Sequence, residues 1–214
     1  MIQTVKKTIW RGLNQLGLGG SVQMHMEGAL KKYGWFQSYH SKRSVDAKGN
    51  PLPWYTYPFI FFLGPRLKPN FEVFEYGSGN STQWYAGRVK QITAVEHEEA
   101  WVEIVRPGLP ANADVLFREL GKAYIEAVSE SGKEYHIVVV DGRERVECAL
   151  YAQKYLTEDG VLILDNSERD HYQPAKDFME NLGFRRLDFY GMGPIVSYEF
   201  CSTVFYRPGN CLGI

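Results

Sequence analysis

Cysteine is scarce in this sequence, and neither sign of charge dominates it. Three cysteines occur in 214 residues, odd in number and widely spaced, so neither a disulfide framework nor a paired metal-binding motif is indicated. The formal net charge is −1, with acidic and basic residues interspersed, so no bulk attraction to nucleic acid is expected. These features favour a protein of the reducing cytoplasm that does not bind nucleic acid.

Long hydrophobic runs are also lacking. The most apolar stretch, residues 54–64, contains a proline and is shorter than the roughly 20 residues that span a bilayer. The N-terminal segment has no continuous apolar core followed by a cleavage site of small residues, so no signal peptide is predicted. We therefore expect a soluble protein without a transmembrane segment.

Residues 2–16 carry one pattern that allows contact with a membrane surface. Their apolar side chains recur at helical spacing beside basic residues. The apolar positions are Ile2, Val5, Ile9, Leu13 and Leu16, and the basic ones are Lys6, Lys7 and Arg11. The pattern is compatible with an ordinary packed helix or with a peripheral helix at a membrane interface.

The character of the sequence changes near residue 70. Before it, glycines, aromatics and prolines occur in irregular order, which predicts an N-terminal helical and aromatic cap segment over residues 1–69 and not an independent domain. After it, short β-branched runs alternate with stretches of helical periodicity, which predicts one domain over residues 70–214. The predicted strands are 71–77, 91–97, 113–120, 135–142 and 159–166, and the predicted helices are 81–89, 98–109, 122–131, 146–156 and 173–183.

Repeated β-α units predict a parallel sheet with helices on both faces. Residues 184–191 and 199–207 alternate well enough to form a closing antiparallel pair. The predicted fold class is therefore α/β: a seven-stranded, mostly parallel, doubly wound sheet with a C-terminal antiparallel strand pair and an N-terminal cap segment.

An acidic residue ends each of four predicted strands: Glu75, Glu96, Asp141 and Asp165. Ligands of parallel α/β sheets bind outside the carboxyl ends of the strands. Carboxylates gathered on that rim repel one another, so fold stability alone does not explain them. Each acid could instead cap the helix that follows it. For the four together we favour a ligand site.

The octapeptide FEYGSGNS, residues 74–81, follows the first predicted strand. Gly77 and Gly79 allow a sharp turn and a close approach of the backbone to a ligand. The helix that begins near Ser81 directs its free N–H groups to the same place. Glu96 lies 19 residues beyond Gly77, at the end of the next strand, where a carboxylate can bind both hydroxyls of a ribose.

Two further residues distinguish between nucleotide cofactors. Thr82 stands where a nicotinamide-dinucleotide fingerprint has its third glycine, which weakens the alternative of a nicotinamide-dependent oxidoreductase. A charged Glu75 inside the turn fits poorly beside a pyrophosphate and suits a nucleoside that carries positive charge. On these residues, the stretch from about 70 to 206 resembles the class I, Rossmann-like S-adenosylmethionine-dependent methyltransferases, whose first motif is an acid, a variable residue, glycine, a variable residue and glycine.

The resemblance implies a site for S-adenosylmethionine around the octapeptide. It implies that Glu75, Gly77 and Gly79 surround the amino-acid part of the cofactor and that Glu96 binds its ribose. The full predicted cofactor-binding set is Glu75, Tyr76, Gly77, Ser78, Gly79, Ser81, Glu96, His97 and Asp141. The chain departs from the family at Ser81, where many members have a third glycine, and after the third strand, where no acidic residue is assigned to adenine.

Asp141, Asp165 and Asn166 end two predicted strands that this topology makes neighbours, about 4.8 Å apart. Two carboxylates and an amide oxygen form the hard ligand set that Mg²⁺ or Ca²⁺ prefers. The constellation is similar to that of metal-dependent catechol and caffeoyl-CoA type O-methyltransferases, although the surrounding motifs differ. A divalent ion there would stabilise a deprotonated acceptor hydroxyl.

The alternative to a metal is a hydrogen-bonded rim whose acids are neutralised by arginines. The available arginines are Arg143, Arg145 and Arg169. A general base would then have to activate the acceptor, and the sequence offers His171, whose other interpretation is an exposed loop histidine. The predicted catalytic residues are Asp141 and His171.

Aromatic residues of the cap segment, together with Arg43, are candidate contacts for the acceptor, although most of the aromatic residues are expected to pack against the sheet. The candidates are Trp35, His40, Arg43, Trp54, Tyr55 and Tyr57. The glycine-rich stretch 190–199 is a second candidate wall of the acceptor site.

Together these features predict an S-adenosylmethionine-dependent methyltransferase that O-methylates a small hydroxylated acceptor, either a sugar or an aromatic compound, with assistance from Mg²⁺ or Ca²⁺ left open. The alternative is a non-catalytic protein that keeps the fold and binds the cofactor as a structural or regulatory ligand. A homodimer is compatible with both.

Overall fold

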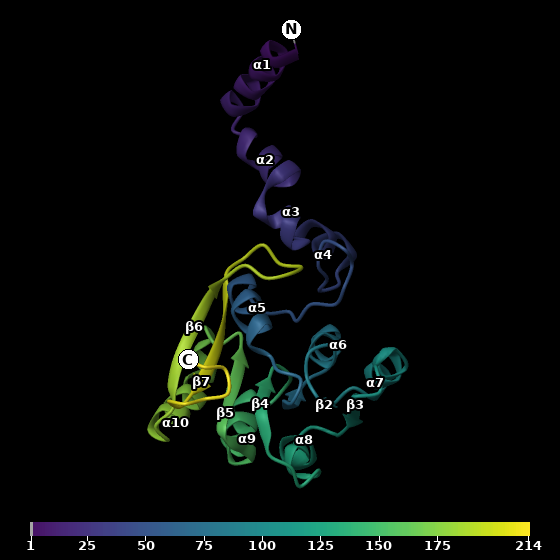
Figure 1. Cartoon of the computed structure of the whole chain (residues 1–214), viewed down its shortest axis with the longest axis vertical. Coiled ribbons are helices and arrows are strands. Elements are labelled where there is room, and N and C mark those ends of the chain that lie inside the picture. Colours follow the sequence, from purple (N-terminus) through teal and green to yellow (C-terminus); the bar gives the residue numbers. More distant parts are fainter. Residues whose placement is uncertain (1) are drawn as a thin grey trace.

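The computed structural model describes residues 2–214 and is built around one seven-stranded sheet with the strand order β3-β2-β1-β4-β5-β7-β6 (Figure 1). Strands β1 to β5 are parallel, whereas β7 runs antiparallel to both β5 and β6. The strands are β1 Glu72–Tyr76, β2 Gln91–Glu96, β3 Ala113–Phe117, β4 Tyr135–Val140, β5 Leu156–Asp165, β6 Arg185–Gly191 and β7 Phe200–Tyr206. The predicted fold class is confirmed.

Helices cover both faces of the sheet because alternate strand residues are apolar toward each side. Side chains of one parity, such as Val73 and Ile137, join a core with α5 and α6, whereas Phe74 and Val138 join a core with α8, α9 and α10. These helices are α5 Tyr57–Leu63, α6 Asn80–Ala86, α7 Glu99–Val105, α8 Lys122–Glu126, α9 Arg145–Ala152 and α10 Gln173–Asn181. Short 3-10 turns lie at Gly64–Arg66, Arg106–Gly108, Ala127–Ser129, Gln153–Tyr155 and Asp170–Tyr172.

Helix α5 is part of the core even though it precedes the first strand. Thr56 caps its N-terminus by accepting a hydrogen bond from Phe59 N. Phe59 and Leu63 are completely buried against the sheet. The packing of α5 therefore fixes the position of the loop before it, which carries Trp54, relative to the strand ends.

Four helices precede the core: α1 Ile2–Gln15, α2 Gly19–Glu27, α3 Ala29–Tyr33 and α4 Trp35–Ser41. Figure 1 shows that α1 and α2 extend away from the sheet, while α4 lies close to the loop between β6 and β7. Among residues 2–214, no helix combines the length and apolarity needed to cross a bilayer. The three cysteines are buried and unpaired.

Candidate functional site

The glycine turn after β1 takes the conformation that its sequence predicts. Gly77 and Gly79 have φ angles of 101° and 147°, which L side chains rarely adopt. Gly79 N donates a hydrogen bond to Thr82 Oγ1 at 3.0 Å, and that hydroxyl donates to Glu75 Oε2 at 2.6 Å. Thr82, the residue that departs from the dinucleotide fingerprint, therefore ties the loop to the acid beneath it.

Glu75 lies beneath this loop and is almost completely buried. Burial raises the pKa of its carboxyl group to about 8, although hydrogen bonds from Ser81 and Thr82 act in the opposite direction. Its side chain fixes the loop from below and does not line the neighbouring cavities. A cation placed above the loop would favour the ionised form of this acid.

Glu96 ends β2 and turns toward the glycine loop. Its Oε1 accepts hydrogen bonds from His97 N at 2.8 Å and Glu98 N at 3.3 Å, and its Oε2 accepts one from Ser78 Oγ at 3.2 Å. His97 Nδ1 also lies 2.6 Å from Glu96 Oε1, without hydrogen-bond angles. The carboxylate is thus held by the backbone on one side and faces the loop with the other oxygen.

Arg145 joins the ends of β4 and β5. Its Nε donates to Gly142 O at 2.9 Å; Nη1 donates to Asp165 O at 2.6 Å and Asn166 Oδ1 at 3.1 Å; Nη2 donates to Asp141 O at 2.6 Å and Asp141 Oδ1 at 3.0 Å. All five guanidinium N–H groups are therefore used inside the protein. Arg145 is buried, so its charge acts on the two strand-end acids at short range.

The pKa values of both acids reflect burial and the neighbouring charges. Burial raises the pKa of Asp141, and the charges of Arg145 and Arg169 oppose that rise. Burial and the charge of Asp141 raise the pKa of Asp165 well above its usual range, and Ser202 Oγ donates to Asp165 Oδ1 at 2.5 Å. Two arginine charges oppose the rise at Asp141 and one opposes it at Asp165, so Asp141 is the better compensated acid.

This arrangement does not fit the predicted metal site. The side-chain oxygens of Asp141 and Asn166 accept hydrogen bonds from Arg145, and Asp165 is bound by Ser202. A monovalent guanidinium therefore lies between the side-chain oxygens of Asp141 and Asn166, where an ion would have to lie, and the Asp165 carboxylate is held by Ser202. Within residues 2–214 no other group of His, Cys, Asp and Glu side chains is arranged to hold a metal.

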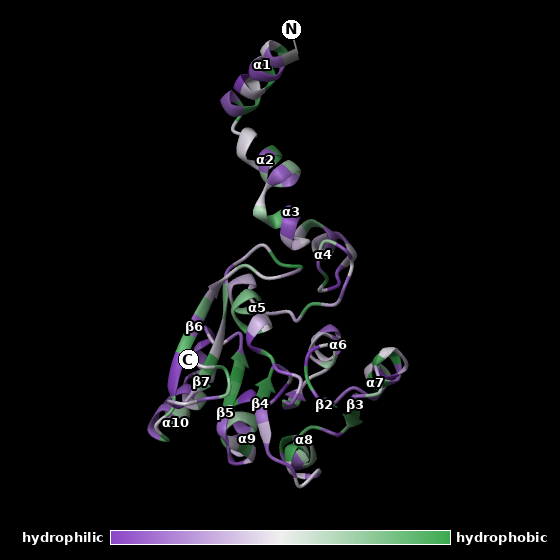
Figure 2. Cartoon of the chain, viewed as in Figure 1, coloured by the Kyte–Doolittle hydropathy of each residue, from purple (hydrophilic) through white to green (hydrophobic). Residues whose placement is uncertain are grey.

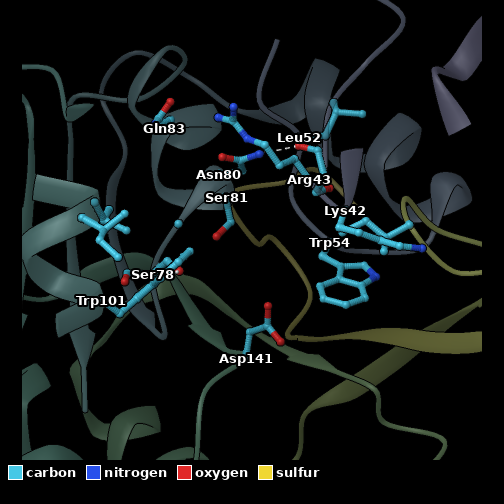
Figure 3. A pocket seen from close by; sticks show the side chains of 15 residues that line it. Lys42, Arg43, Leu52, Trp54, Ser78, Asn80, Ser81, Gln83, Trp101 and Asp141 are labelled. Carbon is cyan, nitrogen blue, oxygen red and sulfur yellow. Dashed lines mark hydrogen bonds between the residues drawn. The ribbon is translucent and has the colours of Figure 1, made fainter. Parts of the chain in front are cut away.

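Three cavities open at the strand ends, and Asp141 lines all of them. One, of about 270 Å³, has walls from Gly77, Ser81, Glu96 and His97. A second, of about 420 Å³, lies between the glycine loop and the cap segment, where Figure 3 shows Asp141 on the opposite side from Asn80.

The third cavity, of about 300 Å³, lies on the other side of Asp141, over β4, β5 and the loop between β6 and β7. Its walls combine the aromatic side chains of Trp54, Tyr198 and Phe200 with Asn166 and Arg169. We call the first two cavities, which border the glycine loop, the polar compartment, and the third cavity the aromatic compartment. Asp141 lines both compartments and lies at their junction.

Several predicted site residues lie elsewhere. His171 is exposed and belongs to none of the three cavity walls. The Tyr76 ring is buried on the opposite face, where its hydroxyl donates to Ile125 O at 2.6 Å. Tyr55 and Tyr57 are core residues.

The remaining cap candidates divide in the same way. Arg43 and Trp54 line the cavities, His40 does not, and Trp35 Nε1 donates to Val196 O at 2.7 Å, which supports the wall from behind. Sequence analysis did not identify Trp101, whose Nε1 donates to Ser78 O at 3.1 Å. Trp101 lies on an exposed face of α7, and no sequence motif marks it as a site residue.

Neither a protein-family model nor a curated protein matches the sequence, whereas many solved structures match the fold. The O-methyltransferase TomG from Streptomyces achromogenes, solved in complex with SAM, is 18% identical, with a TM-score of 0.58 over 88% of this chain and 96% of that one. The O-methyltransferase from Bacillus cereus, solved with SAH, is 16% identical, with a TM-score of 0.58 over 87% and 97%. Precorrin-6y C5,15-methyltransferase from Geobacter metallireducens is 13% identical, with a TM-score of 0.56 over 70% and 87%. These likenesses show that the chain has the class I methyltransferase fold.

Proposed function

We propose that the protein is an S-adenosylmethionine-dependent methyltransferase that methylates an oxygen of a small hydroxylated acceptor, a sugar or an aromatic compound. The observation that carries the proposal is the position of Asp141 at the junction of the polar and the aromatic compartments. A methyl donor and an acceptor seated in those compartments would meet at this carboxylate.

The polar compartment has the features that a cationic nucleoside requires. The positive φ angles of Gly77 and Gly79 turn the backbone sharply at the cavity walls, where it can approach a ligand closely. Glu96 offers an oxygen that is shared only with the Ser78 hydroxyl, which a pair of ribose hydroxyls can replace. A positively charged ligand above the loop would favour ionisation of the buried acid Glu75, which would then supply a negative charge beneath it.

The aromatic compartment suits a flat or ring-shaped acceptor. Trp54 and Tyr198 are 45% and 61% exposed, so their faces are available for stacking against a sugar or aromatic ring. Asn166 and Arg169 supply polar groups at the same wall. Arg145 has no free N–H group and therefore acts here as a positioning residue that orients Asp141.

Methyl transfer needs an acceptor oxygen in line with the donor methyl group, about 3 Å away. Bound S-adenosylmethionine supplies a methyl group activated by its sulfonium. With the cofactor bound, attack by the acceptor oxygen would form the C–O bond as the C–S bond breaks and its electron pair leaves with sulfur, and the Asp141 carboxylate would accept the hydroxyl proton. The products are the methyl ether, S-adenosylhomocysteine and one proton, which Asp141 releases to solvent.

Turnover tests the proposal. The protein is incubated with S-adenosylmethionine and a panel of sugars, phenols and catechols, and S-adenosylhomocysteine is measured. We expect turnover with at least one acceptor class and a loss of about a hundredfold in Asp141→Asn, in which the hydrogen bond to Arg145 survives and the base is lost. The matched control is Asp170→Asn, an exposed acid outside the cavities. Equal rates in the two variants would contradict the role of Asp141.

A further inference from the structure

The N-terminal arm, residues 2–26 of helices α1 and α2, exposes an apolar stripe that no part of the domain covers. Val5, Ile9 and Leu16 are 53%, 56% and 74% exposed; helical spacing places Val5 and Ile9 on one side of α1, and Leu16 follows directly after that helix. Isolated exposed apolar residues are common on protein surfaces, whereas a continuous row along a helix indicates a binding face. This face belongs to the part of the chain farthest from the sheet.

The contact between α1 and α2 leaves this surface incompletely buried. The two helices enclose an open groove of about 640 Å³, whose apolar walls come from Ile9, Trp10, Leu13, Val22 and Met26. Met24 and Met26 on α2 are also about half exposed. Figure 2 shows apolar residues among polar ones on both helices, and the groove joins apolar side chains of α1 to those of α2.

The charge of the arm is of one sign. Lys6, Lys7 and Arg11 lie on α1, and Glu27, at the end of α2, is the first acid of the chain. All 25 acidic residues therefore lie at Glu27 or beyond it, in a chain whose net charge is −1. The arm is locally cationic and the remainder of the molecule is anionic.

We propose that the basic arm, defined as residues 2–26, binds the surface of a bilayer that contains anionic phospholipids. An amphipathic helix that carries lysine and arginine and no acid can bury its apolar face at the boundary between headgroups and acyl chains while the cations contact lipid phosphates. Charge complementarity favours this occupant over a neutral apolar partner. The arm leaves the domain on the side to which the strand ends point, so the rim would face the bilayer.

This proposal is independent of methyl transfer and is tested without turnover. Full-length protein is sedimented with vesicles of equal parts phosphatidylglycerol and phosphatidylcholine and, separately, with vesicles of phosphatidylcholine alone. We expect binding to the anionic vesicles and at least tenfold weaker binding to the neutral ones, together with a loss of binding at high salt.

Two sets of variants separate the arm from the rest of the surface. Replacement of the three arm cations by glutamine is expected to weaken binding roughly a hundredfold, since each contributes about a factor of five near an anionic surface. The charge-matched control replaces three exposed cations of the remaining chain and is expected to change binding less than threefold. The arm variant is Lys6→Gln/Lys7→Gln/Arg11→Gln, and the control is Lys48→Gln/Lys122→Gln/Arg185→Gln.

The apolar stripe is tested by Val5→Ser/Ile9→Ser against Leu120→Ser/Leu182→Ser, a pair of exposed apolar residues outside the arm. Only the first is expected to abolish sedimentation, with the circular dichroism of the folded domain unchanged in both. Equal binding by the arm variants and their controls would overturn the proposal. So would a concentration-dependent dimer that the arm variants dissociate and that does not bind vesicles, because the occupant would then be a second copy of the chain.

Discussion

Arg145 determines what the strand-end acids can do. It occupies the position between Asp141 and Asn166 that a divalent ion would need, and its five N–H groups bind acceptors from the ends of β4 and β5. Removal of a buried cation leaves its acid uncompensated, which costs about 3 kcal/mol or more. The positive charge that compensates the strand-end acids therefore comes from the Arg145 side chain and not from a bound metal ion.

This arrangement predicts that methyl transfer does not depend on a divalent metal. Turnover after treatment with EDTA, and after readdition of Mg²⁺ or Ca²⁺, is expected to stay within twofold of the untreated protein. Loss of turnover with EDTA and its recovery with Mg²⁺ would refute the prediction that methyl transfer is independent of a metal.

The buried position of Arg145 makes a separate prediction for stability. Arg145→Met is expected to lower the free energy of unfolding by about 3 kcal/mol, measured by urea denaturation, whereas Arg143→Met, at an exposed position, should change it by less than about 0.5 kcal/mol. Equal free energies of unfolding in the two variants would argue against this role of Arg145.

At the scale of secondary-structure elements, the sequence predicted the sheet well. Residues 137–140 of β4 and 161–164 of β5 are continuously apolar because both faces of these strands are buried. The acids at their ends could be placed on one rim because parallel strands share a direction. Glu75, Glu96, Asp141 and Asp165 accordingly all lie at that edge.

Side-chain directions within short connections were less predictable. Arg145 reaches the rim because the first turn of α9 brings it back over Asp141, and His171 lies in a 3-10 turn that leaves it in solvent. The aromatic wall was ambiguous because Trp54, at the rim, and Tyr55, in the core, are adjacent in sequence. Only the packing of α5 decides between them.

Two tryptophans hold opposite walls of the site and predict separable effects. Trp35 Nε1 binds Val196 O in the loop that borders the aromatic compartment, and Trp101 Nε1 binds Ser78 O in the glycine loop. Trp35→Phe removes one donor and is expected to raise KM for the acceptor several-fold with little change for S-adenosylmethionine. Trp101→Phe is expected to raise KM for S-adenosylmethionine several-fold with little change in KM for the acceptor. Steady-state kinetics against both substrates measures the split, and parallel changes in both KM values in either variant would argue against the assignment of the compartments.

At the scale of the whole molecule, buried acids couple stability to pH. The pKa of Glu75 is about 8 in the folded protein, against an ordinary value of 4.5. Between these values the unfolded chain releases the proton while the folded protein retains it, so stability falls as pH rises. Above about pH 8 both states are ionised and the contribution no longer changes.

The difference between wild type and Glu75→Gln isolates this effect. We expect the free energy of unfolding of the wild type to decline relative to that of the variant between about pH 4.5 and pH 8, by at most about 1.4 kcal/mol per pH unit. Urea denaturation at a series of pH values gives both curves. Parallel curves would mean that Glu75 is already ionised in the folded state at neutral pH.

The whole molecule has two regions that differ in charge and in proposed function. The anionic domain carries the rim and its compartments, and the cationic arm projects from the side to which the rim faces. The arm was visible in the sequence as an amphipathic pattern, but its lack of contact with the domain is a tertiary property that periodicity alone does not predict.

Calorimetric titration with S-adenosylmethionine tests the central claim, that the polar compartment at the glycine loop binds this cofactor, most directly. The wild type is expected to bind with one site per chain, Glu96→Gln to bind at least tenfold more weakly because it loses a charged acceptor for the ribose hydroxyls, and Glu98→Gln, whose side chain is 65% exposed, to bind like the wild type. No detectable binding by the wild type at millimolar cofactor, or equal affinities in the two variants, would contradict the account.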